Sequence, residues 1–185
     1  MNALRLIAAG HTPALRRAVF GGDDPLDEAG RNATRALRDS PTLQARLFPP
    51  DDGPWLVAPG HAPRQTAELL GAPGIAETPA LAGPDFATWT GRTLDQVDPD
   101  GLQQFLTDPA AAPHGGESLL TAGARLAAWL QRQTTTRGTA IAHPLVIRLI
   151  AAAALDLPPG NAHRLAIAPL TVTRLTHHHG WTLHL

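Results

Sequence analysis

The chain has 185 residues, 43% of them hydrophobic, and a formal net charge of −1. This length and hydrophobic content suit one globular domain with a substantial core and argue against a disordered chain. A net charge close to zero provides no basic surface for nucleic acid. The chain contains no cysteine, which excludes disulfides, thiolate metal sites and cysteine nucleophiles.

Two features indicate the compartment. The N-terminus reads as a strand and lacks the cationic segment and cleavage site of a signal peptide. The longest apolar run, residues 145–157, is interrupted by Arg148 and is too short to span a bilayer. We therefore expect a cytoplasmic protein that does not bind membranes.

The first quarter of the chain predicts a strand, a loop and a helix. Residues 4–9 are almost all apolar, which is typical of a strand covered on both faces, and residues 12–22 follow as a loop. Asp24 suits the cap of a helix and Pro25 its first position. A further turn or helix is expected over residues 41–47. The apolar residues of the first helix recur at helical spacing: Leu26, Ala29, Ala33 and Leu37.

The rest of the chain alternates between short strands and helices. Strands are expected at residues 55–58, 75–81, 140–142, 165–167, 170–175 and 181–185. Helices are expected at residues 63–70, 99–106 and 117–133, and in an almost entirely apolar segment that begins at Pro144.

This alternation predicts an α/β fold, a three-layer α/β/α sandwich with a mostly parallel sheet. Ligands of such sheets bind beyond the carboxyl ends of the strands. The loops at Gly10, Pro59 and His143 each follow a strand, so we expect all three to face one crevice. No repeat or linker divides the chain, which predicts a single domain over residues 1–185.

Several motifs resemble, in order and spacing, those of the histidine phosphatase (phosphoglycerate mutase-like) superfamily. The opening loop, Ala8-Ala9-Gly10-His11-Thr12, aligns with the family's Arg-His-Gly-Glu/Gln-Thr. Gly115-Gly116-Glu117-Ser118 is identical to a common form of the family's acid motif. Four further segments resemble family motifs, at residues 20–30, 64–67, 85–94 and 142–148.

The resemblance implies that the phosphoryl chemistry of the family is lost. Ala8 and Ala9 align with the first Arg and the nucleophilic His of its phosphate pocket, and Ala62 aligns with the second Arg. Alanine supplies no imidazole nitrogen in line with phosphorus. Each lost Arg also removes charge-assisted hydrogen bonds worth roughly 1.5–3 kcal/mol to a bound phosphate. We predict no phosphohistidine intermediate and weak phosphate affinity.

Three titratable residues are the candidate catalytic groups. By resemblance, Glu117 holds the position of the general acid and His143 that of the second His. The alternative for Glu117 is a helix-start carboxylate stabilised by the helix dipole, and for His143 a structural histidine. His11, in the opening loop, is either a neutral substitution on a surface loop or a new base at the mouth of the pocket. The second reading is open because imidazole titrates near neutral pH.

A second set of residues is expected to line the pocket. Arg17 is the candidate cation for an anionic substrate group, or else a solvated loop residue. His61 and His114 lie near the same crevice by family analogy, but no His-x-His or His-Glu-x-x-His spacing supports a metal site. We therefore expect no metal and no cofactor. The candidate substrate-binding residues are Ala8, Ala9, Thr12, Arg17, Phe20, His61 and Ala62.

Two classes of function remain open. In the first, an apolar-floored pocket takes a largely uncharged small molecule. Glu117 and His143 then carry out cofactor-free acid–base chemistry, such as elimination, isomerisation, cyclisation or hydrolysis, in bacterial natural-product biosynthesis. In the second, the chain is a non-catalytic pseudophosphatase that binds a metabolite or a protein partner, with Trp89 or Trp181 at its interface. A residual phosphatase is a third reading, and a homodimer is a further expectation.

Overall fold

The computed structural model describes residues 2–41, 53–134 and 137–184. Within these residues six strands form one sheet in the order β3-β2-β4-β1-β5-β6. β3, β2, β4 and β1 run parallel, whereas β5 and β6 are antiparallel to their neighbours. This arrangement confirms the predicted α/β fold. The strands are β1 (Asn2–Ala8), β2 (Trp55–Val57), β3 (Ile75–Glu77), β4 (Gly138–Ala142), β5 (Val172–His177) and β6 (Trp181–His184).

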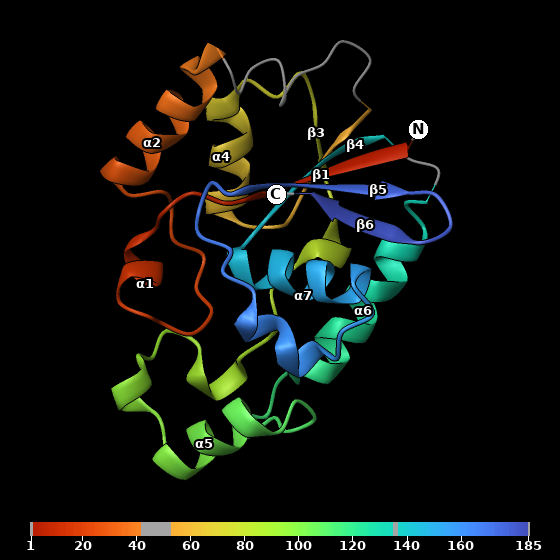
Figure 1. Ribbon diagram of the computed structural model, residues 1–185. Coiled ribbons are helices and arrows are strands. Elements are labelled where there is room, and N and C mark those ends of the chain that lie inside the picture. The colour runs from red at the N-terminus through yellow and green to blue at the C-terminus, as the bar shows by residue number, and fades with distance from the viewer. Residues whose placement is uncertain (1, 42–52, 135–136, 185) are drawn as a thin grey trace.

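Helices cover both faces of the sheet. Figure 1 shows α2 and α4 over one face and α6 and α7 over the other, which makes three layers, while α5 lies in a lobe away from the sheet. The α-helices of the described residues are α1 (Pro13–Arg16), α2 (Glu28–Asp39), α4 (His61–Leu70), α5 (Pro99–Thr107), α6 (Leu119–Gln131) and α7 (Pro144–Ala154). Short 3-10 turns span Pro79–Leu81, Ala87–Trp89, Leu94–Gln96 and Pro159–Arg164.

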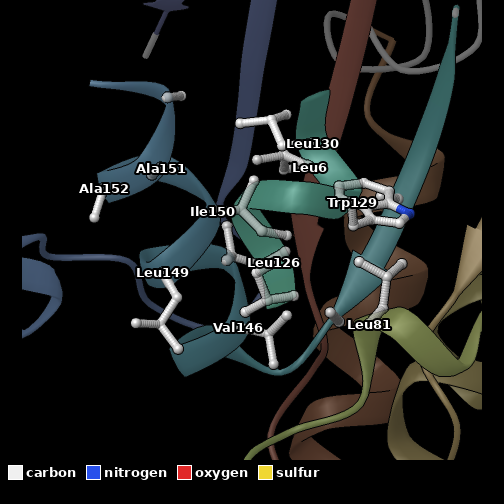
Figure 2. Packing of buried hydrophobic residues seen from close by; sticks show 14 of the residues in the cluster. Leu6, Leu81, Leu126, Trp129, Leu130, Val146, Leu149, Ile150, Ala151 and Ala152 are labelled. Carbon is white, nitrogen blue, oxygen red and sulfur yellow. The ribbon is translucent and has the colours of Figure 1, made fainter. Parts of the chain in front are cut away.

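The largest apolar core lies between the sheet and the helices α6 and α7. Figure 2 shows Leu6 of β1 packed with Leu126 of α6 and Ile150 of α7. These three side chains have no exposed surface, and burying each contributes about 1.5–3 kcal/mol. The core explains why the segment after Pro144 is apolar on nearly all sides.

The segment predicted as a loop over residues 12–22 contains the helix α1. The hydroxyl of Thr12 accepts a hydrogen bond from the backbone N–H of Leu15 at 3.1 Å. The carboxylate of Asp24 accepts a second one from the N–H of Ala14 at 3.0 Å. These two side chains satisfy N–H groups that have no partner within the helix, and so they stabilise a single turn.

The next helix begins later than predicted. Because Asp24 bonds to α1, it does not cap α2, and Asp27 takes that position by accepting the N–H of Gly30 at 2.6 Å. The buried positions of α2 are Gly30 and Thr34. The expected apolar stripe is therefore wrong at two positions, which are exposed: Ala29 and Ala33.

Other predicted elements also differ from the structure. Residues 165–167 do not form a strand. β3 ends at Glu77 because Pro79 starts a 3-10 turn. The last-but-one strand begins after Leu170, whose φ of +62° does not occur within a regular strand. The helix or turn expected at residues 41–47 falls almost entirely outside the described residues.

Candidate functional site

The carboxyl ends of β2, β4 and β1 meet at one edge of the sheet. These strands are neighbours and parallel. The N–H of Ala9 donates to the carbonyl of Ala142 at 2.8 Å, and the N–H of Gly10 donates to the Thr66 hydroxyl of α4 at 3.0 Å. The three loops after these strands therefore face the same edge, as predicted.

Three alanines lie at this edge. Ala8 and Ala9 have no exposed surface and Ala62 has 1%. Ala9 and Ala62 pack with Leu26 in one small apolar cluster, whereas Ala8 belongs to the main core. The expectation that these methyl groups form an open floor is therefore wrong for this structure, because neighbouring side chains exclude solvent from them. Their contact with a substrate stays a prediction.

His143 stands between β4 and α7. Its side chain is partly buried, and burial lowers the pKa of its imidazole below the ordinary value of 6.5. The carboxylate of Asp23 acts in the opposite direction and raises this pKa. The imidazole is therefore neutral at neutral pH and can accept a proton.

The carboxylate of Asp23, from the loop after α1, lies at the N-terminus of α4. One oxygen accepts a hydrogen bond from the backbone N–H of His61, and the other lies 3.7 Å from Nε2 of the same histidine. Gly60 permits this approach, since a Cβ there would come within 2.7 Å of the carboxylate and its φ is +110°. The carboxylate thus contacts His61 and acts electrostatically on His143.

Glu117 is held by an arginine two helical turns away. Its two oxygens accept hydrogen bonds from Arg125 at 3.0 and 2.7 Å. The same guanidinium donates to the carbonyls of Ala80 at 2.7 Å and Ala82 at 3.2 Å. Glu117 precedes α6, whose cap is Ser118. In this structure the Glu117 carboxylate accepts hydrogen bonds from Arg125, which joins α6 to the loop after β3. Its role as a general acid stays a prediction.

Residues 6–185 match the family described as the histidine phosphatase superfamily, branch 1. The protein is a member of this superfamily. No curated protein matches its sequence. That Ala8 and Ala9 replace the Arg and His of the superfamily's opening loop stays a prediction from the aligned motifs.

Solved structures of phosphatases share the fold. A mutant phosphoserine phosphatase from Entamoeba histolytica, in complex with phosphoserine, has a TM-score of 0.83 at 20% identity, covering 99% of this chain and 95% of that one. A mycobacterial glucosyl-3-phosphoglycerate phosphatase complexed with VO3 has 0.83 at 24% identity, covering 100% and 98%. A putative alpha-ribazole-5'-P phosphatase from Escherichia coli has 0.83 at 19% identity, covering 100% and 96%. At these identities the likeness shows the fold alone.

The opening loop of this superfamily member packs against α1 and α2. The carbonyl of His11 accepts the N–H of Asp27 at 3.0 Å, and Nδ1 of His11 is buried without a hydrogen-bond partner among the described residues. Thr12 is buried and caps α1. Arg17 is exposed and donates to the carbonyl of Pro13 at 3.4 Å, which fits a solvated loop residue. Their proposed catalytic or binding roles stay predictions.

Phe20 and His114 belong to an aromatic cluster in the lobe that contains α5. The ring of Phe20 lies 4.9 Å from that of Trp89 and 5.2 Å from that of Phe86. His114 is 1% exposed and 5.3 Å from Trp89. Its Nδ1 accepts the N–H of Gly116 at 3.0 Å, and burial lowers its pKa, partly opposed by Asp85. Phe20 and His114 therefore pack this lobe.

Two kinds of feature are missing from the described residues. No group of three or more His, Cys, Asp or Glu side chains in them is placed to hold a metal ion. None of the helices described is long and apolar enough to cross a membrane.

The structure thus divides the candidate residues. It places His61 against the carboxylate of Asp23, and it pairs Glu117 with Arg125. Sequence reasoning missed both Asp23 and Arg125. The eight-residue spacing from Glu117 to Arg125 along a predicted helix was a usable signal, whereas the contact of Asp23 with α4 depends on the tertiary fold.

Proposed function

We propose that this member of the histidine phosphatase superfamily forms no phosphohistidine and is a cofactor-independent acid–base enzyme that acts on a small organic metabolite. One observation carries the proposal. At the end of β1 stands Ala9, fully buried, while a partly buried imidazole, His143, follows the adjacent strand β4. Alanine has no atom that accepts a phosphoryl group, whereas a neutral imidazole accepts a proton.

The reaction class follows from these groups. A base without a metal or cofactor supports elimination, isomerisation, cyclisation or hydrolysis, and a natural-product pathway is the proposed setting. His143 is the proton acceptor. Glu117 and His11 complete the proposed catalytic set, with Glu117 as a hydrogen-bond acceptor because Arg125 already binds both of its oxygens.

The test is direct. The purified protein is incubated with metabolites made by enzymes encoded near its gene, and products are followed by mass spectrometry. We expect a mass-shifted or rearranged product that His143→Ala abolishes while the fold, measured by circular dichroism, is unchanged. Full turnover in His143→Ala would contradict the proposal, and stable transfer of phosphorus-32 from a phosphomonoester to the protein would also contradict it.

A second candidate is a non-catalytic pseudophosphatase. The closed alanine floor and the pairing of Glu117 with Arg125 favour it, because both leave fewer free polar groups at the site. The Entamoeba histolytica neighbour provides a parallel, since a form of that protein with His mutated to Ala is in complex with phosphoserine. Calorimetry with phosphoserine separates the readings: saturable binding without product supports the second, and release of inorganic phosphate supports a residual phosphatase.

A further inference from the structure

A buried histidine that the proposed reaction does not use lies three residues before Glu117. His114 is 1% exposed. The centre of its ring lies 5.4, 5.3 and 5.6 Å from those of Phe86, Trp89 and Phe105, and all three contacts are edge-to-face. Aromatic rings prefer this geometry, so the cluster fixes the orientation of the imidazole.

The two ring nitrogens of His114 have different surroundings. Nδ1 accepts the backbone N–H of Gly116 at 3.0 Å, so the neutral ring carries its proton on Nε2. Nε2 is buried and has no hydrogen-bond partner in the part of the chain that the structure describes, and the rings around it are weak acceptors. Burial lowers the pKa of this histidine, partly opposed by Asp85. The neutral form that the bond to Gly116 needs is therefore the one present at neutral pH.

The bond to Gly116 lies within a turn that leads directly to Glu117. Gly115, before it, has a φ of +78°, which favours glycine. A Cβ on Gly116 would come within 2.1 Å of the carbonyl oxygen of Asp85 and within 3.1 Å of Nδ1 of His114. The same carbonyl of Asp85 accepts the N–H of Glu117 at 2.8 Å. The backbone of the turn is thus enclosed between a carbonyl on one side and the imidazole on the other.

We propose that His114 is a positioning residue for Glu117: its imidazole holds the N–H of Gly116 and so fixes the backbone from which the Glu117 carboxylate projects. This inference rests on the proposed function, in which Glu117 belongs to the catalytic set. His114 is too deeply buried to touch a substrate, so it takes no part in proton transfer. Catalytic groups are held to within about 0.5 Å by neighbours of this kind, which packing and hydrogen bonds fix in turn.

The assignment gives the aromatic cluster a role beyond filling the lobe. Arg125 holds the tip of the Glu117 side chain, whereas His114 holds the peptide from which that side chain starts. Because Trp89 and Phe105 of α5 contact the ring of His114, packing within the lobe sets the position of a candidate catalytic group.

The experiment reads the position of Glu117 through its partner. The Nε–H of Arg125 donates to one oxygen of Glu117 at 3.0 Å, so the proton and nitrogen signals of this group report the bond in nuclear magnetic resonance spectra of the full chain. Glu117→Ala supplies the reference signal for loss of the bond. No substrate is needed.

Two variants of His114 separate its hydrogen bond from its packing. His114→Phe keeps an aromatic ring in the cluster but has no acceptor for the N–H of Gly116. His114→Asn places an amide oxygen where Nδ1 stands but leaves the space of the ring empty. We expect the Arg125 signal to shift in His114→Phe toward its position in Glu117→Ala, and to stay near that of the parent in His114→Asn. Urea unfolding should give the opposite order, with His114→Asn the less stable, because it creates a cavity.

A role in packing alone predicts that the Arg125 signal follows stability and moves more in His114→Asn than in His114→Phe. That result, or an unmoved signal in His114→Phe, would overturn the proposal. The unsubstituted chain gives a test that does not depend on any variant folding, since a ring that carries its proton on Nδ1 would also overturn it.

An activity assay separates this proposal from the function on which it rests. With a substrate of the proposed enzyme, turnover falls in His114→Phe and is restored in His114→Asn. If the parent turns over no substrate while the Arg125 signal behaves as expected, the assignment of His114 stands and the proposed enzymatic function fails.

Discussion

The link between Glu117 and Arg125 makes a quantitative prediction about stability. If the pair is structural, Glu117→Gln destabilises the protein, because it removes the charge from two hydrogen bonds of 3.0 and 2.7 Å. Hydrogen bonds to charged groups are worth about 1.5–3 kcal/mol each. The side chains of Glu117 and Arg125 are 18% and 28% exposed, so solvent weakens the pair, and we expect a cost of about 2 kcal/mol.

Arg125→Met removes more. It also deprives the carbonyls of Ala80 and Ala82 of their donor, and we expect a total cost of about 3–4 kcal/mol. The double variant costs about as much as Arg125→Met alone, since the second change removes nothing further. The coupling energy between the two positions is then about 2 kcal/mol, which is the quantity that a double-mutant cycle isolates.

Urea unfolding followed by circular dichroism measures all four proteins. With a slope of about 1–3 kcal/mol per molar urea, a loss of 2 kcal/mol moves the midpoint by roughly 1 M. A Glu117→Gln variant as stable as the parent, with additive single effects, would refute the reasoning. It would mean that Glu117 is held for chemistry at the site and contributes nothing to the fold.

Three further predictions concern pH, strain and a buried hydrogen bond. The pKa values of His114 and His143 are lowered by burial, so the unfolded chain binds more protons below pH 6.5 than the native one. The contribution of these two histidines to the free energy of unfolding is complete above pH 6.5 and falls as the pH drops below it. Urea midpoints measured between pH 8 and 5 check this, and we expect a shallower fall in His114→Phe. A midpoint that rises on acidification would exclude the prediction. Gly60→Ala costs about 1–3 kcal/mol because of the positive φ at this position, and the new Cβ also collides with Asp23. We expect its melting temperature to drop further than that of Gly71→Ala, because Gly71 has a φ of +84° but no neighbour within 4 Å. Equal losses in the two variants would count against the contact between Gly60 and Asp23. Thr66→Val leaves the N–H of Gly10 without an acceptor and costs about 1–3 kcal/mol. The control, Thr107→Val, loses only an exposed hydrogen bond of its hydroxyl and changes the melting temperature little. Similar effects at both positions would be inconsistent with the structure.

The sequence predicted those features that depend on local pattern. The apolar run of β1 and the all-round apolar character of α7 show in any short window, because a strand or helix buried on several sides needs such a composition. Trp181 and Leu183 alternate with polar residues, and β6 is the edge strand that this pattern indicates. The local pattern of these elements is enough to place His143 and Gly10 at the same edge of the sheet.

Features that depend on competition between distant groups were not predictable in this way. Asp24 has two N-termini within reach, and only the folded chain shows that it bonds to α1, which moves the start of α2. Glu117 lies in a motif that implies a general acid. Its partner Arg125, however, also donates hydrogen bonds to two carbonyls of another loop. Asp23 reaches α4, 38 positions further along the chain. Each depends on three-dimensional proximity that no local pattern encodes.

The position of β1 in the sheet has a consequence for synthesis of the chain. Both of its hydrogen-bonded neighbours, β4 and β5, come from residue 138 onward. At about 5–20 residues per second, a ribosome leaves the first strand without either neighbour for on the order of ten seconds. During that interval the strand has two open edges and an apolar sequence, a combination that invites pairing with other nascent chains. We therefore expect translation of this protein to depend on factors that shield its N-terminal segment until the last quarter emerges.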